Sequence, residues 1–268
     1  MKLNWPIVLN ILGLLLAING LSMLLGIPFS LYYQDGDLMA LLLSGMVSVG
    51  AGAALWYSTR NHKKQIKKRE GYLIVGLGWL IMSISGALPY LFGNVFVLEN
   101  GMPDVAAAVF ETVSGYTTTG ASAMTDIESV GKGILFWRAT THWIGGMGII
   151  VLTIAILPIL GIGGMQLFAA ESPGPSTDKL HPRIQSTATR LWLIYVGMTV
   201  VETILLMVGD MSFYDALCHS FATVSTGGFS TKNASVAHFD SPLIQWTIIL
   251  FMFLSGVYFT LTYWGLIG

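Results

Sequence analysis

The sequence is organised around a short segment that reads Phe110-Glu111-Thr112-Val113-Ser114-Gly115-Tyr116-Thr117-Thr118-Thr119-Gly120-Ala121-Ser122. A related segment runs from Leu217 to Phe229 and ends in Val224-Ser225-Thr226-Gly227-Gly228-Phe229. Matching Gly120 to Gly227 sets the two segments 107 positions apart. Each follows an apolar stretch too short to cross a bilayer. Because irregular backbone at membrane depth is tolerated only where it is buried in protein or lines a water-filled path, we expect two re-entrant pore loops.

The composition indicates a membrane protein. Hydrophobic residues make up 54% of the chain and charged residues only 10%, whereas charged residues form about a quarter of a typical soluble domain. The single cysteine, Cys218, excludes an internal disulfide framework. The sequence therefore predicts an all-α polytopic membrane protein that lies in a lipid bilayer and has no nucleic-acid partner.

Apolar runs of about 17 to 25 residues can span a membrane as helices. Six such runs occur, at residues 7–28, 38–58, 72–97, 134–160, 191–209 and 243–266, and two short dips lie at 104–122 and 212–231. Internal repeats of this kind are typical of transport folds. We expect two N-terminal helices in 1–60, a basic cytoplasmic loop in 61–71, a first helix–pore-loop–helix repeat in 72–168, a cytoplasmic linker in 169–190 and a second repeat in 191–268.

The distribution of lysine and arginine predicts the orientation. The ends and loops that we assign to one side hold ten basic residues: Lys2, Arg60, Lys63, Lys64, Lys67, Lys68, Arg69, Lys179, Arg183 and Arg190. The other side holds only Lys132, Arg138 and Lys232. By the positive-inside rule the N-terminus is cytoplasmic. The outer loops are acidic, which concentrates cations near them.

Each dip has the pattern of a short helix followed by an ion-coordinating strand. Asp104 can cap a helix from Val105 to about Gly115, and the partially negative C-terminal end of that helix would stabilise a cation within the membrane. Backbone carbonyls of the following residues can replace the water shell of an ion. We predict a filter made of Thr117, Thr118, Thr119, Gly120, Val224, Ser225, Thr226 and Gly227. Glycine suits Gly120 and Gly227 because a Cβ would obstruct the required backbone conformations.

Further residues are expected to support the filter: Glu111, Arg138, Gly145, Gly146 and Gly228. The glycines of Gly145-Gly146-Met147-Gly148 allow close packing against the pore loops, and Arg138 is interpreted as a clamp on an outer-loop acid. With the glycines matched, Cys218 takes the place of Glu111 in the second dip. His142 and His219 are interpreted as interhelical hydrogen-bond partners rather than metal ligands.

Several stretches resemble the superfamily of bacterial potassium-uptake subunits that includes TrkH and KtrB, with plant HKT transporters as distant members. These are the two filter segments, residues 137–150 with their Trp143-Ile144-Gly145-Gly146-Met147-Gly148, residues 164–175, and Lys179-Leu180-His181-Pro182-Arg183-Ile184. The likeness is greater to TrkH than to KtrB. It implies a potassium-channel-like fold, K⁺ as the transported ion with no other cofactor or metal, and a bacterial inner membrane.

The resemblance also implies that a complete pore needs more than the two repeats of this chain. The family arranges four repeats around one pore, so the sequence looks like the N-terminal half of such a protein. A complete pore would then need a separate C-terminal half or a second copy of the chain in a homodimer. The family also docks on nucleotide-binding regulatory subunits of the TrkA/KtrA type, which would contact the cytoplasmic face.

Three functional hypotheses stay open. The first is a pore-forming subunit of a Trk-type K⁺ uptake system, which is not an enzyme. The second is a non-conducting half that is inert or regulatory. The third is an intramembrane hydrolase, which needs a serine nucleophile with a paired base. Ser122 is the candidate nucleophile, but with the glycines matched the second loop carries Phe229 at its position.

Overall fold

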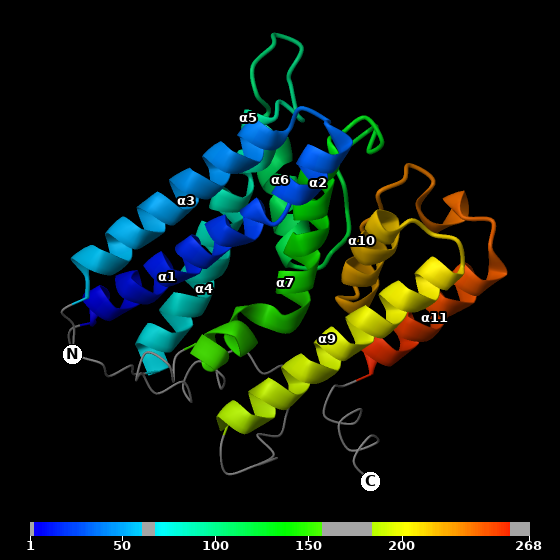
Figure 1. The fold of residues 1–268 in the computed structure, drawn as a ribbon. Helices are drawn as coiled ribbons and strands as arrows, with labels where there is room; N and C mark the ends of the chain where they lie inside the picture. The colour runs from blue at the N-terminus through cyan, green and yellow to red at the C-terminus, as the bar shows by residue number, and fades with distance from the viewer. Residues whose placement is uncertain (1–2, 61–67, 157–183, 258–268) are drawn as a thin grey trace.

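The computed structural model describes residues 3–60, 68–156 and 184–257. Every regular element in these ranges is a helix, and one isolated bridge joins Val97 to Pro103 in a loop. The elements shown in Figure 1 are α1 Trp5–Leu24, α2 Ile27–Tyr33, α3 Leu38–Ser58, α4 Lys68–Gly86, α5 Leu88–Phe92, α6 Val105–Tyr116, α7 Lys132–Ile156, α9 Ile184–Val208, α10 Phe213–Val224, the 3₁₀ helix η1 Ser235–His238 and α11 Pro242–Gly256.

Four of the described helical segments are long and apolar enough to cross a membrane: Trp5–Tyr33, Leu38–Ser58, Arg69–Phe92 and Arg190–Val208. The predicted runs 38–58 and 191–209 agree with two of them. The first run was predicted to end at residue 28, but the observed segment continues through α2 to Tyr33. Pro28 does not end it, because it lies in the first turn of α2, where proline is tolerated. The third run ends at Phe92 rather than at residue 97, because the chain leaves the helix at Gly93.

The other two predicted runs coincide with α7 and α11. Residues 157–160 of one and 258–266 of the other lie outside the described residues, as do residues 61–67 of the basic loop and 169–183 of the linker. Helix α7 is interrupted at Gly148, whose φ of 68° and ψ of 146° are not helical. Gly148 therefore turns the second part of α7 away from the axis of the first, as Figure 1 shows.

The N-terminal helices α1 and α3 pack through small residues. A side chain on Gly13 would lie 2.8 Å from the carbonyl oxygen of Gly52, and one on Gly20 would lie 2.8 Å from that of Gly45. Glycines placed two turns apart on each helix in this way let two membrane helices approach closely. The buried Asn19 then joins this pair to the first repeat, since its amide donates to Ser85 Oγ at 2.8 Å and its carbonyl accepts from the Tyr116 hydroxyl.

Helix α7 lies at the centre of the molecule. In Figure 1 it stands between α1, α3 and α4 on one side and α9, α10 and α11 on the other. It is joined to the second group by the Tyr195 hydroxyl, which donates to the Trp143 carbonyl at 2.9 Å, and by stacking of Trp143 on Phe221. The two repeats are thus packed on one helix.

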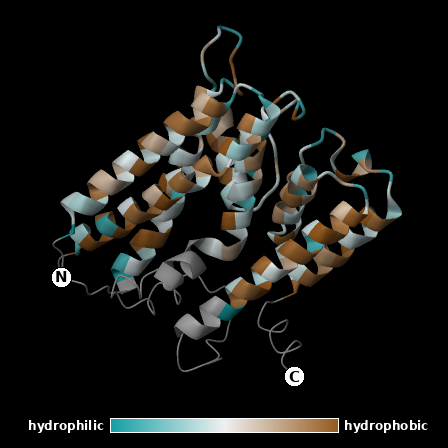
Figure 2. Cartoon of the chain, in the orientation of Figure 1, coloured by the Kyte–Doolittle hydropathy of each residue, from teal (hydrophilic) through white to brown (hydrophobic). Residues whose placement is uncertain are grey.

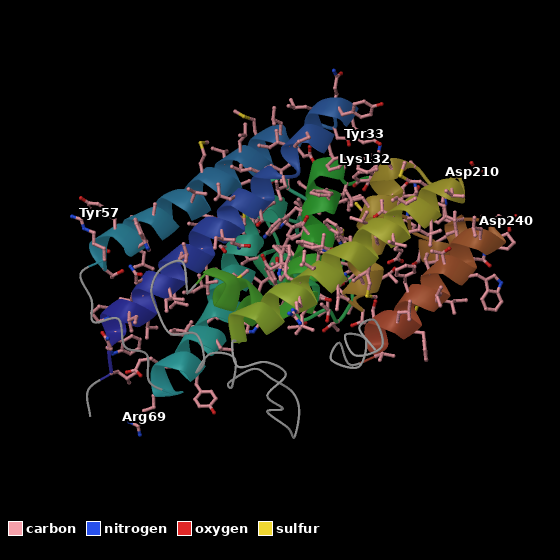
Figure 3. All side chains as sticks on the ribbon, turned by 60° about the horizontal axis from the view of Figure 1, so that its bottom comes forward. Tyr33, Tyr57, Arg69, Lys132, Asp210 and Asp240 are labelled. Atoms are coloured by element: carbon pink, nitrogen blue, oxygen red, sulfur yellow. The ribbon has the colours of Figure 1, made fainter. Side chains whose placement is uncertain are left out.

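The outer surface of the bundle is apolar. Figure 2 shows hydrophobic residues along α9 and α11 and hydrophilic residues at many helix ends and in the connecting loops. Trp246 and Phe253 of α11 are 70% and 71% exposed. Figure 3 places Tyr57 and Arg69 at one end of the bundle and Asp210 and Asp240 at the opposite end. This surface is that of a multi-pass membrane protein, with an apolar band between two polar ends.

Candidate functional site

Two short helices, α6 and α10, carry the residues that the sequence singles out. The Asp104 carboxylate accepts a hydrogen bond from the Ala107 amide at 3.0 Å, which confirms the predicted cap of α6. Ser212 caps α10 in the same way, since its hydroxyl accepts from the Asp215 amide at 3.1 Å. Both helices are 12 residues long, which is about 18 Å at the rise of an α-helix and too short to span.

The loops after α6 and α10 have the same backbone conformation. Thr118 and Thr226 have φ values of 51° and 58°, and Gly120 and Gly228 have φ values of 76° and 93°. Left-handed conformations are strained for residues other than glycine. The same pattern of strain at two sites shows that these loops are structural equivalents.

The repeat interval is therefore 108 residues, and the predicted interval of 107 is wrong. The bounds of α6 and α10 differ by 108 at both ends. The loop hydrogen bonds follow the same interval: Thr118 N to Gly115 O, Thr119 N to Ser114 O, Thr226 N to Thr223 O and Gly227 N to Ala222 O. The sequence comparison matched glycine to glycine by identity, whereas the backbone requires glycine at 228.

The corrected interval changes the equivalences within the predicted filter. Ser225, Thr226 and Gly227 correspond to Thr117, Thr118 and Thr119, and Gly228 corresponds to Gly120. Val224 is the last residue of α10 and is 1% exposed. Its counterpart is Tyr116, also 1% exposed, so both residues anchor a helix end in apolar surroundings.

The two loops meet at Gly120. A side chain on this residue would collide with the carbonyl oxygen of Gly227. Thr117 and Thr119 are exposed, and their hydroxyl oxygens lie 2.8 Å apart. The predicted filter residues of both repeats are thus brought together around one contact.

A buried ion pair holds the strands that leave the two loops. Glu111 accepts hydrogen bonds from the Ser122 hydroxyl at 2.9 Å and from the Ala123 amide at 2.7 Å. Arg138 Nε lies 2.6 Å from Glu111, and both side chains are almost fully buried. The same guanidinium donates to the Ser230 carbonyl at 2.9 Å. The partner of Arg138 is therefore the first pore helix, and not an outer-loop acid as predicted.

In the second repeat, His219 takes the place of Glu111. Its Nδ1 lies 2.7 Å from the Asp215 carbonyl, which can only accept, so Nδ1 carries the proton. Its Nε2 then accepts from the Ser230 hydroxyl at 2.9 Å. His219 thus bonds within its own repeat and not between helices, and the predicted equivalence of Cys218 to Glu111 is wrong. Cys218 packs in an apolar cluster with Phe136.

This equivalence also changes the comparison of the two exit strands. Ser230, and not Phe229, corresponds to Ser122. In both repeats the helix residue and its serine are 11 positions apart. That spacing was the signal in the sequence that could have identified the correct interval. Because both serines tie an exit strand to its pore helix, Ser122 has a structural partner in Glu111 rather than a histidine base.

Gly145 and Gly146 lie against the starts of the two loops. A Cβ on Gly145 would be 2.9 Å from the carbonyl carbon of Tyr116, and one on Gly146 would be 2.6 Å from Cβ of Ser225. The close packing of these glycines on the pore loops is as predicted from the sequence. One helix, α7, thus backs both loops at once.

A polar clasp joins the loop of residues 126–128 to Asn233 of the second repeat, and the sequence alone did not indicate it. The side-chain amide of Asn233 accepts from the backbone N–H of Ile127 at 2.7 Å and donates to the Asp126 carboxylate at 2.8 Å. The backbone N–H of Asn233 donates to the Glu128 carboxylate at 3.0 Å. The hydrogen bond from Asn233 lowers the pKa of Asp126 below its ordinary value. No motif of known spacing marks this contact between residues 105 to 107 positions apart.

Comparison with known proteins points to one family. A family model described as "TrkH: Cation transport protein" matches residues 37–267. The Trk system potassium uptake protein TrkH of Escherichia coli K12 is 44% identical over 255 residues, which cover 95% of this chain and 52% of that protein. TrkG of the same organism is 35% identical over 258 residues, covering 96% of this chain and 52% of that protein.

A solved structure has the same fold. The crystal structure of the potassium transporter TrkH from Vibrio parahaemolyticus superposes with a TM-score of 0.80 at 38% identity, and covers 97% of this chain and 52% of that one. The chain thus spans about half the length of these relatives. Since the family model matches residues 37–267 and the chain superposes on the solved fold over 97% of its length, the chain belongs to the TrkH family of cation transport proteins.

Proposed function

We propose that the chain forms one half of a potassium-conducting pore. The observation that carries the proposal is the pair of pore loops, which follow capped 12-residue helices and share the same strained backbone at Thr118 and Thr226. Strain of this kind persists only where the surrounding structure enforces it, and it is concentrated at functional sites. The relatives at 44% and 35% identity are named as potassium uptake proteins.

In this proposal K⁺ is coordinated by backbone carbonyls of two strands, Thr117–Gly120 and Ser225–Gly228. Carbonyl oxygens replace the water shell that the ion loses on entry. The C-terminal ends of α6 and α10 place partial negative charge beside the same strands. Val224 would support the second strand from the end of its helix rather than line it.

Glu111, Arg138, Gly145 and Gly146 would support the filter. The buried ion pair holds both exit strands, and the two glycines hold both loop starts against α7. K⁺ would be the transported ion at the filter, and the proposal includes no resident cofactor. Within the described residues, no group of three or more histidine, cysteine or acidic side chains is arranged to hold a metal ion.

Two strands cannot surround an ion, so the pore requires a further component. The relatives are about twice as long, which supports a C-terminal half like theirs as that component; a second copy of the chain in a homodimer is the alternative. We place the complex in a bacterial inner membrane with the N-terminus in the cytoplasm, where a TrkA/KtrA-type nucleotide-binding subunit would dock. The basic residues near α3 and α4 support this orientation.

Rubidium uptake tests the proposal. The chain is expressed in cells without their own potassium transporters, alone and together with a C-terminal half from a TrkH relative. Uptake with the C-terminal half supports a split pore, and uptake by the chain alone supports a homodimer. No uptake in either case, with membrane insertion verified, would favour the non-conducting half.

The filter assignment has its own test in Gly120→Ser. A serine at φ 76° is strained, and its side chain would push on the Gly227 carbonyl. We expect a weaker preference for Rb⁺ and K⁺ over Na⁺ in competition uptake assays. An unchanged preference in a folded variant would contradict the assignment.

A further inference from the structure

Gly227 differs from the other glycines of the two loops. Gly120 and Gly228 have left-handed φ values of 76° and 93°, which favour glycine over any other residue. Gly227 has no such φ, so its backbone alone would accept an L side chain. Its counterpart in the first loop, Thr119, carries one. The absence of a side chain at 227 needs a different explanation.

The explanation is the imidazole ring of His142. A Cβ on Gly227 would lie 2.5 Å from Cε1 and 2.7 Å from Cγ of this ring. Real Cβ atoms do not approach other atoms so closely, and interiors of this density leave no slack for the ring to shift. His142, on α7, therefore excludes a side chain at 227 by its volume.

The ring of His142 is held firmly in place. It is completely buried and stacks on Phe229, with centroids 3.8 Å apart and ring planes at 15°. Arg138, one turn earlier on α7, lies 3.5 Å from the centroid of the same Phe229 ring and is fixed by Glu111. Neither nitrogen of His142 makes a hydrogen bond of normal geometry, although the backbone of Ser114 lies near enough to interact with the ring. The ring is thus held mainly by stacking and close packing rather than by hydrogen bonds.

The second loop is less confined elsewhere. A cavity of about 330 Å³ is lined by Thr226, Gly227 and Gly228 together with side chains of η1 and α11. A Cβ on Gly228 would meet no atom within 4 Å. The His142 ring is therefore the firm contact against which the Gly227 backbone rests.

We propose that His142 is a positioning residue that sets the distance between the two filter strands. Its ring fixes Gly227, and the Gly227 carbonyl lies against Gly120 of the first loop. A displacement of Gly227 would therefore change the distance of this carbonyl from the first strand. The preference for K⁺ over Na⁺ depends on how many carbonyl oxygens coordinate the ion and how they are held. The selectivity part of this inference rests on the proposed function, whereas the steric contact does not.

The test uses Gly227→Ala, His142→Ala and the double variant, with the chain expressed together with a C-terminal half. Gly227→Ala is expected to lower the apparent Tm of the purified protein by about 3 °C or more. In the double variant the added methyl group has the space of the removed ring, so most of this loss disappears. His142→Ala alone is expected to reduce the preference for Rb⁺ over Na⁺ severalfold, and the double variant to recover part of it.

Gly228→Ala is the matched control. It is strained by its φ of 93° and not by a neighbour, so His142→Ala cannot relieve it. Equal rescue at 227 and 228, or single losses at 142 and 227 that simply add, would overturn the contact. Rescue of the Tm with unchanged selectivity in His142→Ala would overturn the positioning role. Absence of uptake by the unmutated complex would instead count against the proposed function, and the Tm comparison would still decide the contact.

Discussion

At the scale of single residues, the most consequential contact is the ion pair between Glu111 and Arg138. Each charge is almost fully buried, and each has further hydrogen bonds to an exit strand. A buried ion pair stabilises a protein little more than apolar residues of similar volume would, but loss of only one partner leaves an uncompensated buried charge. The two residues therefore depend on each other more than the protein depends on the pair.

Glu111→Gln is expected to destabilise the folded protein by about 3 kcal/mol, because Arg138 remains charged and buried without its counter-ion. The same cost is expected for Arg138→Gln. The double variant should recover a large part of the loss, since two neutral amides can hydrogen-bond to each other. Thermal unfolding of the purified variants in detergent measures these differences.

Glu99→Gln serves as the control for this cycle. Glu99 lies on an exposed turn that precedes α6, and its replacement should leave the Tm within about 1 °C of the unmutated value. If the double variant were as unstable as the sum of the single variants, the two residues would not act as a pair.

At the scale of elements, the two pore loops are tied to different anchors. The first loop is held by the carboxylate of Glu111 and the second by the neutral imidazole of His219. Each of these side chains is hydrogen-bonded to a serine of its exit strand. One arginine serves both strands, so the second repeat needs no charge of its own. The Asn233 clasp in turn holds the loop of residues 126–128 to the second repeat.

Asn233→Asp is expected to open the clasp in a pH-dependent manner. The new carboxylate would face Asp126, and two like charges raise the pKa of both. Because raised pKa values favour the protonated forms in the folded state, the destabilisation is greatest at neutral pH. It is relieved as the pH falls through the raised pKa values, and the relief is complete near the ordinary aspartate pKa of about 4. Hydrogen exchange of the loop amides, measured at pH 7 and at acidic pH with the intrinsic rate corrected, tests this.

Asn233→Ala is the comparison for that experiment. It removes the hydrogen bonds to Asp126 and Ile127 without adding a charge. The loop amides should exchange faster than in the unmutated protein, and the acceleration should change little between the two pH values. A pH dependence equal to that of Asn233→Asp would contradict the electrostatic account.

At the scale of the whole molecule, α7 connects the two repeats, and the apolar surface with its polar ends fits the bundle to a membrane. Helix α7 contacts both loop starts, supplies Arg138 and His142, and breaks at Gly148. The bundle around it has polar ends that carry opposite charge, with Arg69 at one end and Asp210 and Asp240 at the other (Figure 3). Orientation in the membrane is therefore a property of the complete bundle.

Cysteine labelling tests the orientation that we propose. In a Cys218→Ser background, Asp240→Cys should react with a membrane-impermeant maleimide in intact cells, because Asp240 is exposed at the acidic end. Tyr57→Cys, which is exposed at the opposite end, should react only after the cells are opened. The reverse pattern would place the N-terminus outside.

Much of this architecture could be predicted without a structure. Long apolar runs can satisfy their backbone polar groups in a bilayer only as helices, so the runs at 38–58 and 191–209 identified spanning helices to within a residue. Asp104 and Ser212 mark the starts of the two short helices because an N-terminal turn needs a side-chain acceptor. These are local requirements, and local sequence is sufficient to reveal them.

The pairing of residues across the fold could not be predicted in this way. The repeat interval of 108 residues could not be read from the sequence, because positions 227 and 228 are both glycine. Gly228 is the one with the left-handed φ that matches Gly120, whereas a side chain at 227 is excluded by the His142 ring. The partner of Arg138 could not be identified from the sequence either: an acid of an outer loop was expected, and the structure pairs Arg138 with Glu111. By itself the sequence determined a helical membrane protein with two short capped helices, since hydropathy and caps are local, and its motifs indicated a resemblance to the TrkH family. Only the tertiary structure decided which side chains hold those loops, because steric exclusion and buried charge pairing depend on residues that folding brings together.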